Sequence, residues 1–598
     1  RAKEYALARE SAKQTLYPYN RINLIQKEIL HMIRNQFQLA LKTIQKTIQK
    51  NYKTATENFL FTAIFVNLFQ MIFGAENSIV GVAFAIIMPA SMLLDLAAKP
   101  VKNFFSQFII MEAMTIASFL VGKWNPYGAI PINLIILFFL LYFFTFEYAM
   151  DLYMPYLLSY LFLVFISPIT LEQLPKRMIS VFFGSACIIC YHLVKGNHRM
   201  GKAVSNTLTE IIEEVQDSLQ CLLSGKCVPN NTEVVHNNLC KLSHLIYERR
   251  NRALHISDAA LAMLDCGLIL EDLNDTLYNA KRTITPEDER ILEKVKTRLN
   301  EFHTFIQCPR KEPTALNRED FSFQNDFEKK LYQSLERIQD RIYHMKDENK
   351  QKTFQKTSFS KLVQIKGTIQ ASPVRFIYSL RIAILLTILT ALVQILNLPH
   401  GKWLLFTVAS VSLPYADDVG NKAKKRLWAT LAGGCASVIA FSCIPSMTGR
   451  TIVMLAAGYI SSYLSDYRFT FACSTVGALG GAVLMNTFGW ESVGNVFMIR
   501  LGYICAGIII AYVANCIFFP FKRQLAMGQL KEKYLDTIKL LVHTFHEKKA
   551  EPQLYYSLIM QALLQEEKLQ KNMTSGEWKE IKIALESITT SPCLLQRS

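Results

Sequence analysis

A single carboxylate, Glu112, lies near the middle of the strongly apolar stretch 104–119. A lone carboxylate at that depth in a membrane costs at least ~2.5 kcal/mol on insertion scales. We therefore expect it to be protonated, paired with a cation or exposed to water. Two interpretations stay open: a group that couples transport to proton movement or gates it, and a structural group that pairs with an arginine or stays a neutral acid.

Basic side chains border the other apolar stretches and are candidates for binding an anion. The densest group has four basic residues between positions 422 and 426, and it opens a stretch that soon reaches Gly433 and Gly434. Small residues let helix backbones approach closely in lipid. The group either anchors the chain by the positive-inside rule or binds an incoming anion. Arginines near helix ends can also extend their side chains to the membrane interface. The candidate substrate-binding residues are Arg381, Lys424, Lys425, Arg426, Arg500, Arg177 and Lys99.

No pattern in the sequence is typical of an enzyme. A glycine-rich phosphate loop is missing, so ATP-driven pumping by this chain alone is not expected, and no Ser/His/Asp or Cys/His arrangement stands out. Cys187 and Cys190 have a redox-like spacing, but they lie in an apolar stretch, which favours a buried inert pair. We therefore expect no cofactor and no metal site.

The net charge of +17 fits anionic lipid headgroups better than nucleic acid, because no aromatic-basic stripe accompanies it.

The elements that must position these residues are apolar stretches of about 17–22 residues, long enough to cross a ~30 Å hydrocarbon core as helices. We expect twelve spans, of which 153–167 and 403–417 are short. They lie near 59–75, 79–98, 104–121, 129–146, 153–167 and 178–194, and near 376–396, 403–417, 427–444, 450–464, 469–485 and 496–519.

The two sets of six stretches repeat one another. Pro89 corresponds to Pro414 at an offset of 325 residues, as Lys99 does to Lys424, and Arg177 corresponds to Arg500 at an offset of 323. An even number of spans returns the chain to the same side, so the two copies are expected to be parallel. Duplicated bundles of this kind usually place a pathway where their halves meet.

The remaining segments are predicted to be helical and cytoplasmic. Basic residues flank the spans on the side of the N-terminal tail, and no cleavable signal is visible, which indicates that both termini are cytoplasmic. The expected fold is an all-α integral membrane protein with an α-helical cytoplasmic domain. Its parts are 1–58 (amphipathic N-terminal helices), 59–195 (transmembrane repeat 1), 196–375 (helical cytoplasmic domain), 376–520 (transmembrane repeat 2) and 521–598 (helical C-terminal segment).

The second half resembles the fusaric acid resistance family, which includes aromatic acid exporters and is related to aluminium-activated malate channels. The resemblance rests on Arg381 early in one span, Trp403 opening the next, the basic cluster followed by Gly433 and Gly434, and Arg500 in the last span. The first half departs from this pattern, because Asn58 and Val80 stand where Arg381 and Trp403 have their counterparts. The resemblance implies an integral membrane protein that moves organic anions, often aromatic carboxylates, out of the cell.

The sequence therefore predicts an efflux transporter of the plasma (inner) membrane, with a small organic anion as substrate and membrane lipids as surroundings. Protons moving on Glu112 could drive export. A passive anion channel and a membrane-anchored scaffold or regulatory protein stay open as alternatives. A homodimer through the cytoplasmic helices stays open as well.

Overall fold

The computed structural model describes residues 52–346 and 373–589 with gaps. The gaps are residues 54, 93–95, 97–99, 146–151, 196–198, 225–230, 249–257, 281–285, 308–312, 315, 317–325, 445, 465, 486–492, 519 and 547–551. The described part is helical and contains no strand, which confirms the all-α class. The predicted helices of 1–51 and the candidate Lys99 lie outside the described residues.

A helix lies in each of the twelve predicted apolar stretches. In the first half these are the helix Ala55–Phe73, α2 (Ser78–Ser91), α3 (Pro100–Lys123), α4 (Pro126–Phe144), α5 (Tyr153–Phe165) and α6 (Leu174–Lys195). In the second half they are α14 (Pro373–Ile395), α15 (Lys402–Val411), α16 (Ala416–Cys443), α17 (Met447–Ser461), α18 (Tyr467–Met485) and α19 (Val493–Val513).

Seven of the helices in the described part of the chain are long and apolar enough to cross a membrane by themselves. The short segments α5 and α15 are among the apolar helices below that length, as the short stretches 153–167 and 403–417 indicate. The chain is therefore a multi-pass membrane protein with at least this set of candidate spans.

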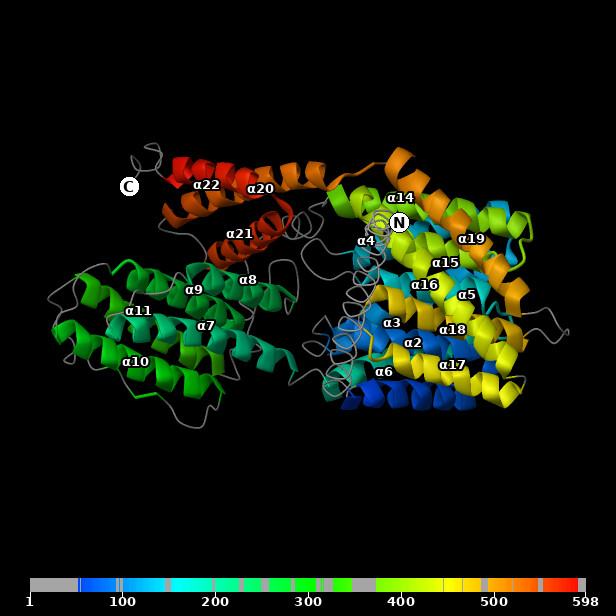
Figure 1. Ribbon diagram of the computed structural model, residues 1–598, viewed down its shortest axis with the longest axis horizontal. Helices are drawn as coiled ribbons and strands as arrows, with labels where there is room; N and C mark the ends of the chain where they lie inside the picture. The colour runs from blue at the N-terminus through cyan, green and yellow to red at the C-terminus, as the bar shows by residue number, and fades with distance from the viewer. Residues whose placement is uncertain are drawn as a thin grey trace, which may run out of the picture. The chain divides into compact units, whose positions relative to one another are not determined.

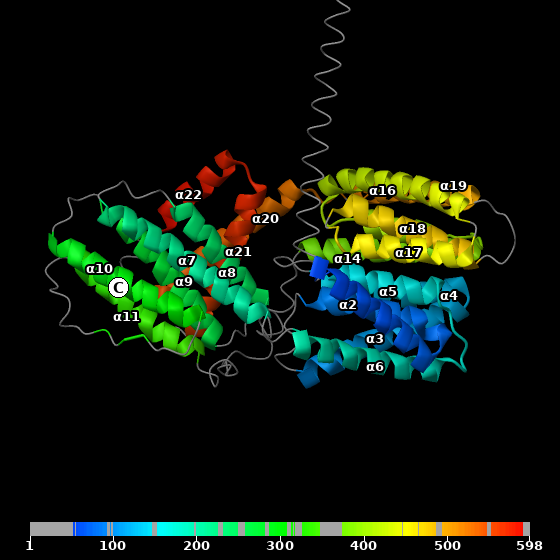
Figure 2. The same ribbon diagram turned by 60° about the horizontal axis from the view of Figure 1, so that its bottom comes forward.

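The described helices fall into two compact units that cut across the sequence repeat. One unit contains the described residues up to Phe65 together with those of Lys424–Gly502, and the other contains the described residues of Val66–Ala423 and those from Tyr503 onward. In the second unit α3 packs along α6 (Figure 2), and in the first α17 packs along α18.

The first helix of each half packs against the fourth helix of the other half. In one unit α14 lies along α4, where the rings of Phe138 and Phe376 meet edge to face at 5.8 Å. In the other unit the helix Ala55–Phe73 meets α17, where the rings of Phe59 and Tyr459 lie 5.3 Å apart and the Thr56 and Tyr459 hydroxyls are hydrogen bonded at 2.9 Å. The halves are thus interlocked by equivalent contacts, and neither is a self-contained bundle.

The inserted helical domain has a core of its own. Its helices are α7 (Arg199–Leu223), α8 (Thr232–Glu248), α9 (Asp258–Tyr278), α10 (Pro286–Gln307) and α11 (Asp326–Lys346). Helices α7, α9, α10 and α11 lie alongside one another (Figure 1). Helix α10 begins at Pro286, because proline is favoured in a first turn that needs no amide donor.

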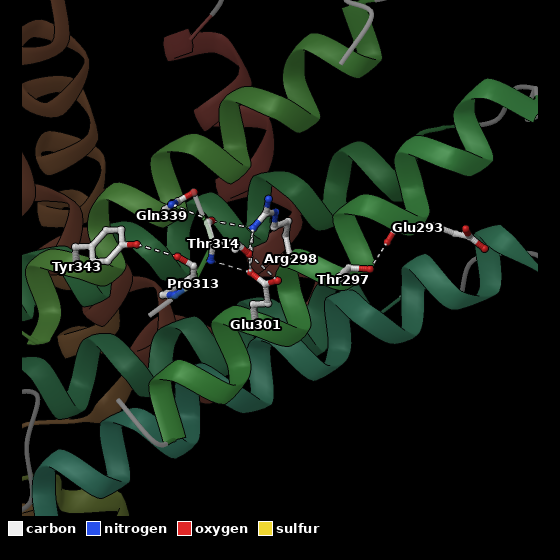
Figure 3. Close-up of polar contacts among 8 residues, drawn as sticks. All are labelled: Glu293, Thr297, Arg298, Glu301, Pro313, Thr314, Gln339 and Tyr343. Carbon is white, nitrogen blue, oxygen red and sulfur yellow. Dashed lines mark hydrogen bonds and ion pairs between the residues drawn. The ribbon is translucent and has the colours of Figure 1, made fainter. Parts of the chain in front are cut away.

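The connection after α10 is fastened to the helices beside it (Figure 3). Arg298 donates to the Thr314 carbonyl at 2.8 Å, and the Thr314 hydroxyl donates to both oxygens of the Glu301 carboxylate. The Tyr343 hydroxyl donates to the Pro313 carbonyl at 3.1 Å. Burial acts to raise the pKa of Glu301, but the hydrogen bonds from Thr314 and the charge of Arg298 hold it below its usual value.

The C-terminal helices join this domain to the membrane helices. They are α20 (Arg523–His546), α21 (Pro552–Asn572) and α22 (Ser575–Thr589). Three side chains of α21, Met560, Leu563 and Leu564, belong to the core of the inserted domain. A second cluster of buried side chains combines Leu530 and Tyr534 of α20 with Val374 at the start of α14.

Candidate functional site

Two buried arginines, one on α16 and one on α19, form the site with the most evident binding chemistry. Arg426 is 4 % exposed and Arg500 is 5 % exposed. The two guanidinium groups are close enough for their like charges to interact. Like charges repel, and burial strengthens the repulsion, so an anion near both groups would be stabilised by each.

Aromatic side chains of α18 surround Arg426. Its guanidinium lies over the Phe471 ring, 4.3 Å from the ring centroid, and the Tyr467 hydroxyl lies beside it. Such a cation–π contact contributes roughly 0.5–2 kcal/mol. The Nε and Nη1 groups of Arg426 have no hydrogen-bond partner within the part of the chain that the structure describes. Two donors on a buried charge are therefore available to an acceptor from outside the protein.

The predicted glycine pair brings the helices of this site together. A Cβ atom on Gly433 would lie 2.3 Å from the Ala472 carbonyl oxygen of α18. A Cβ atom on Gly434 would lie 1.9 Å from the Phe497 ring of α19. Since neither contact could accommodate a side chain, the two glycines let α16 approach α18 and α19 at once, which is the close helix packing expected of small residues in lipid.

Arg381, the predicted cation of α14, donates hydrogen bonds to the protein backbone. Its Nη2 group donates to the Leu413 carbonyl at 2.7 Å and to the Pro414 carbonyl at 3.3 Å. These carbonyls lie in the break between α15 and α16, where helical hydrogen bonding ends. Arg381 is 3 % exposed and therefore holds this break in place from within the protein.

Arg177, the predicted cation of α6, is enclosed by hydrogen-bond acceptors. Its Nε group donates to the Asn77 side chain at 2.9 Å. Its Nη1 and Nη2 groups donate to the carbonyls of Ser167 and Glu76, and Nη2 also donates to the Ser167 hydroxyl. The side chain is fully buried, and these bonds tie the start of α2 to the loop that precedes α6.

The predicted lysines lie on the surface of α16. Lys424 is exposed and Lys425 is half-buried, one turn or less before Arg426. The structure therefore separates the predicted basic cluster into an outer pair of lysines and an inner arginine.

Glu112 lies inside the first half, on α3, and is 7 % exposed. Both carboxylate oxygens lack a hydrogen-bond partner among the described residues. An ionised carboxylate without a donor is strongly disfavoured in such a place, whereas a protonated one is tolerated. The geometry therefore fits the neutral acid form.

Two polar pairs join α5 to the neighbouring helices, and the tyrosines in them were not singled out from the sequence. The Tyr156 hydroxyl of α5 donates to Gln107 of α3 at 2.8 Å, and the Tyr160 hydroxyl donates to Asn133 of α4 at 2.8 Å. Tyrosines are common in apolar spans, so only the contacts distinguish these from ordinary core residues. The same holds for Phe471 beside Arg426.

The described part of the chain contains no group of His, Cys, Asp or Glu side chains that could hold a metal ion. The most unusual ionisable group outside the membrane helices is His236 of α8. Hydrogen bonds with Cys240, Glu271 and Glu566 favour its charged form and raise the pKa of His236 to about 12. Its Nδ1 atom lies 2.7 Å from Glu271 of α9, and its Nε2 atom lies 3.5 Å from Glu566 of α21.

The fold and the site together define an α-helical, multi-pass membrane protein with a buried cationic site. Residues 386–514, about a fifth of the 598-residue chain, match the family model described as fusaric acid resistance protein-like, in the half of the chain where the sequence resembles that family. The match contains Arg426, Arg500 and the glycine pair, and it begins after Arg381. The match favours a transport or efflux role in a membrane. A search among curated proteins and a search among solved structures found no match to the chain.

Proposed function

We propose that the protein exports an organic anion, aromatic or carboxylate in character, across the plasma membrane. In this proposal the two repeats are parallel and together supply twelve membrane spans. Both termini and the inserted domain are cytoplasmic. The observation that carries the proposal is the buried Arg426, which keeps two unpartnered donors among the described residues while a second arginine lies nearby.

The site suits a carboxylate for three reasons. A guanidinium presents several donors in a planar fork that matches the two oxygens of a carboxylate. Entry of an anion relieves the repulsion between Arg426 and Arg500. The Phe471 ring under the guanidinium supplies an apolar, aromatic wall for the rest of the ligand. The exposed Lys424 of the same helix would attract the anion without holding it in the site.

The energy for export would come from proton movement on Glu112. Its carboxyl group is buried and unpartnered among the described residues, so it would bind a proton firmly in this conformation. Release of that proton would require a second conformation in which Glu112 reaches water or a donor. A carboxyl group with two such environments can couple proton transfer to a conformational change.

The test is uptake of radiolabelled benzoate by proteoliposomes that contain the full chain. We expect Arg426→Gln to lose most of the flux at an unchanged amount of folded protein. Lys424→Gln is the matched control, because it removes a positive charge from the exposed face of the same helix, and we expect it to keep most of the flux. Equal loss in both variants would contradict a buried binding site.

Energy coupling is tested separately with an imposed pH gradient. Glu112→Gln is expected to abolish the part of the benzoate flux that depends on the gradient. Undiminished gradient-dependent flux in this variant would remove Glu112 from the mechanism. Currents in planar bilayers far too large for a carrier would instead favour a passive channel, and a complete lack of benzoate movement would favour the scaffold alternative.

A further inference from the structure

The beginning of α16 and the end of α19 are joined by a set of hydrogen bonds. The Ala416 amide donates to the Phe521 carbonyl at 3.0 Å. The Asn515 side chain donates to the Ser412 hydroxyl at 3.1 Å and to the Ala511 carbonyl. Asn515 lies in a π-helical turn, Ala514–Phe518, that follows α19 directly. Such turns are rare and often occur at functional sites.

Arg523, the first residue of α20, binds two aspartate carboxylates at this junction. Its backbone amide donates to the Asp417 carboxylate at 2.8 Å, and its guanidinium donates to the Asp418 carboxylate at 2.5 Å. We call Asp417, Asp418 and Arg523 the clasp. Both aspartates lie in the first turn of α16, where the helix dipole also favours a negative charge.

The clasp lies near the ends of the two helices that carry the buried arginines. Arg426 lies eight residues after Asp418 on the continuous helix α16, which is about 12 Å along the axis at ~1.5 Å per residue. Arg500 lies on α19, whose end is fixed through Asn515 and Phe521 in the same junction. Both buried arginines thus lie on helices whose ends are at this junction.

The clasp is also connected to the inserted domain. The Arg523 guanidinium donates to Asn572, the last residue of α21, at 2.8 Å. Farther along α21, Glu566 accepts a hydrogen bond from Tyr534 of α20 at 3.2 Å and lies 3.5 Å from His236 of the inserted domain. One helix thus touches both the clasp and the inserted domain.

The charged part of the clasp is partly exposed and borders a cavity. The side chains of Arg523 and Asp418 are 36 % and 41 % exposed, and a cavity of about 570 Å³ lies against Asp417 and Arg523. Partly exposed ion pairs are weak and are screened by salt. The buried arginines, in contrast, lie in a closely packed region where small shifts matter.

We propose that Arg523 is a positioning residue for the anion site: its clasp on Asp417 and Asp418 sets α16 against α19, and helix α21 gives the inserted domain a means to open it. This inference rests on the proposed function, because it assigns Arg523 an effect on the anion that Arg426 and Arg500 would bind. Arg523 itself does not touch the anion.

The test measures benzoate flux in proteoliposomes at a series of benzoate concentrations. Arg523→Gln is expected to raise the half-saturating benzoate concentration by about fivefold or more, the lower end of typical coupling between sites. Arg523→Lys keeps the charge that pairs with Asp418, and it should lie close to the wild type. Lys522→Gln is the matched control, because it removes the neighbouring charge, which lines the same cavity but is not part of the clasp.

A double variant separates positioning from general damage. Asp418→Asn should raise the half-saturating concentration as Arg523→Gln does, and the two changes together should do little more than either alone, because they break one interaction. Asp418→Asn also carries the test if Arg523→Gln does not fold, since it leaves the other contacts of Arg523 in place.

The possible results separate this inference from the proposed function. Wild-type flux with an unchanged half-saturating concentration in Arg523→Gln and Asp418→Asn would overturn the clasp role and leave the anion site standing. Additive effects of the two changes would also overturn it, because independent damage adds. A lack of benzoate flux in the wild type would overturn both, since the clasp has no anion site to position.

Discussion

Substitution of Gly434 by alanine tests the packing that brings α16 to α19. An added Cβ would lie 1.9, 2.3 and 2.6 Å from three ring carbons of Phe497. Carbon atoms pack best at about 3.5–4.0 Å, so the ring or its helix would have to move by about 1.5 Å. Overpacking of this kind costs roughly 1–3 kcal/mol. Phe497 lies one turn before Arg500 on α19, so the same displacement should also lower benzoate flux.

The assay is the apparent melting temperature of the full chain in detergent, together with benzoate flux per folded protein. Gly477→Ala, on α18, is the matched control, because its added Cβ would meet nothing within 4 Å. We expect Gly434→Ala to melt several degrees below Gly477→Ala. In the Gly434→Ala background, Phe497→Ala removes the clashing ring and should restore part of the lost stability.

Two results would refute this reasoning. One is a Gly434→Ala variant as stable as Gly477→Ala, which would mean that α19 lies farther from α16 than the structure places it. The other is strict additivity between Gly434→Ala and Phe497→Ala, because residues in contact should show a coupling energy of about 0.5–3 kcal/mol.

Two further predictions concern Arg177 and His236. Arg177→Lys cannot reproduce the forked hydrogen bonds to Asn77, Ser167 and Glu76, so the variant should lose about 1.5–3 kcal/mol per charged hydrogen bond. Its melting temperature should fall while the half-saturating benzoate concentration stays unchanged; a raised concentration would instead place Arg177 at the substrate. Because the pKa of His236 is raised to about 12 in the folded protein, its stabilising effect is complete below the unfolded value of about 6.5 and is lost as the pH rises toward 12. The wild type should therefore lose more melting temperature between pH 7 and pH 10 than His236→Gln, and equal slopes would contradict the charged His236.

The sequence predicts the local features of this fold well, because they depend on neighbouring residues. Long apolar stretches give helices in a membrane, and Gly433 and Gly434 mark a close helix contact. The interlocking of the halves was not predicted. Contacts such as Phe138 with Phe376 join residues more than two hundred positions apart, and an aromatic residue in an apolar stretch gives no sign of its partner.

The candidate site is likewise predicted from the sequence only in its local features. Arg177, Arg381 and Arg426 are alike in sequence, since each is an arginine near the end of an apolar stretch. What distinguishes them is the supply of acceptors, which depends on distant chain segments. Arg177 has acceptors from three residues around its guanidinium, whereas Arg426 has an aromatic ring beneath it and two donors unused within the described chain. The number of unused donors on a buried cation therefore separates structural arginines from candidate binding ones.

The buried ionisable groups of the two repeats bear on how the repeats work together in the proposed mechanism. Helices α3 and α16 are equivalent under the offset of 325, so Glu112 corresponds to Ser437, and Arg426 corresponds to Val101. The Ser437 hydroxyl donates to the Gly433 carbonyl of its own helix, so α16 carries no carboxylate at the equivalent position. Each of the two equivalent helices thus carries one buried ionisable group that the other lacks: an acid that fits the neutral form on α3 and a cation with unused donors on α16. Alternating access in duplicated transporters is largely a movement of one repeat against the other, so in the proposed mechanism the movement that exposes Glu112 to water would also be the movement that changes access to Arg426. Proton release and anion binding would then be linked by the repeat itself, without a contact between the two groups.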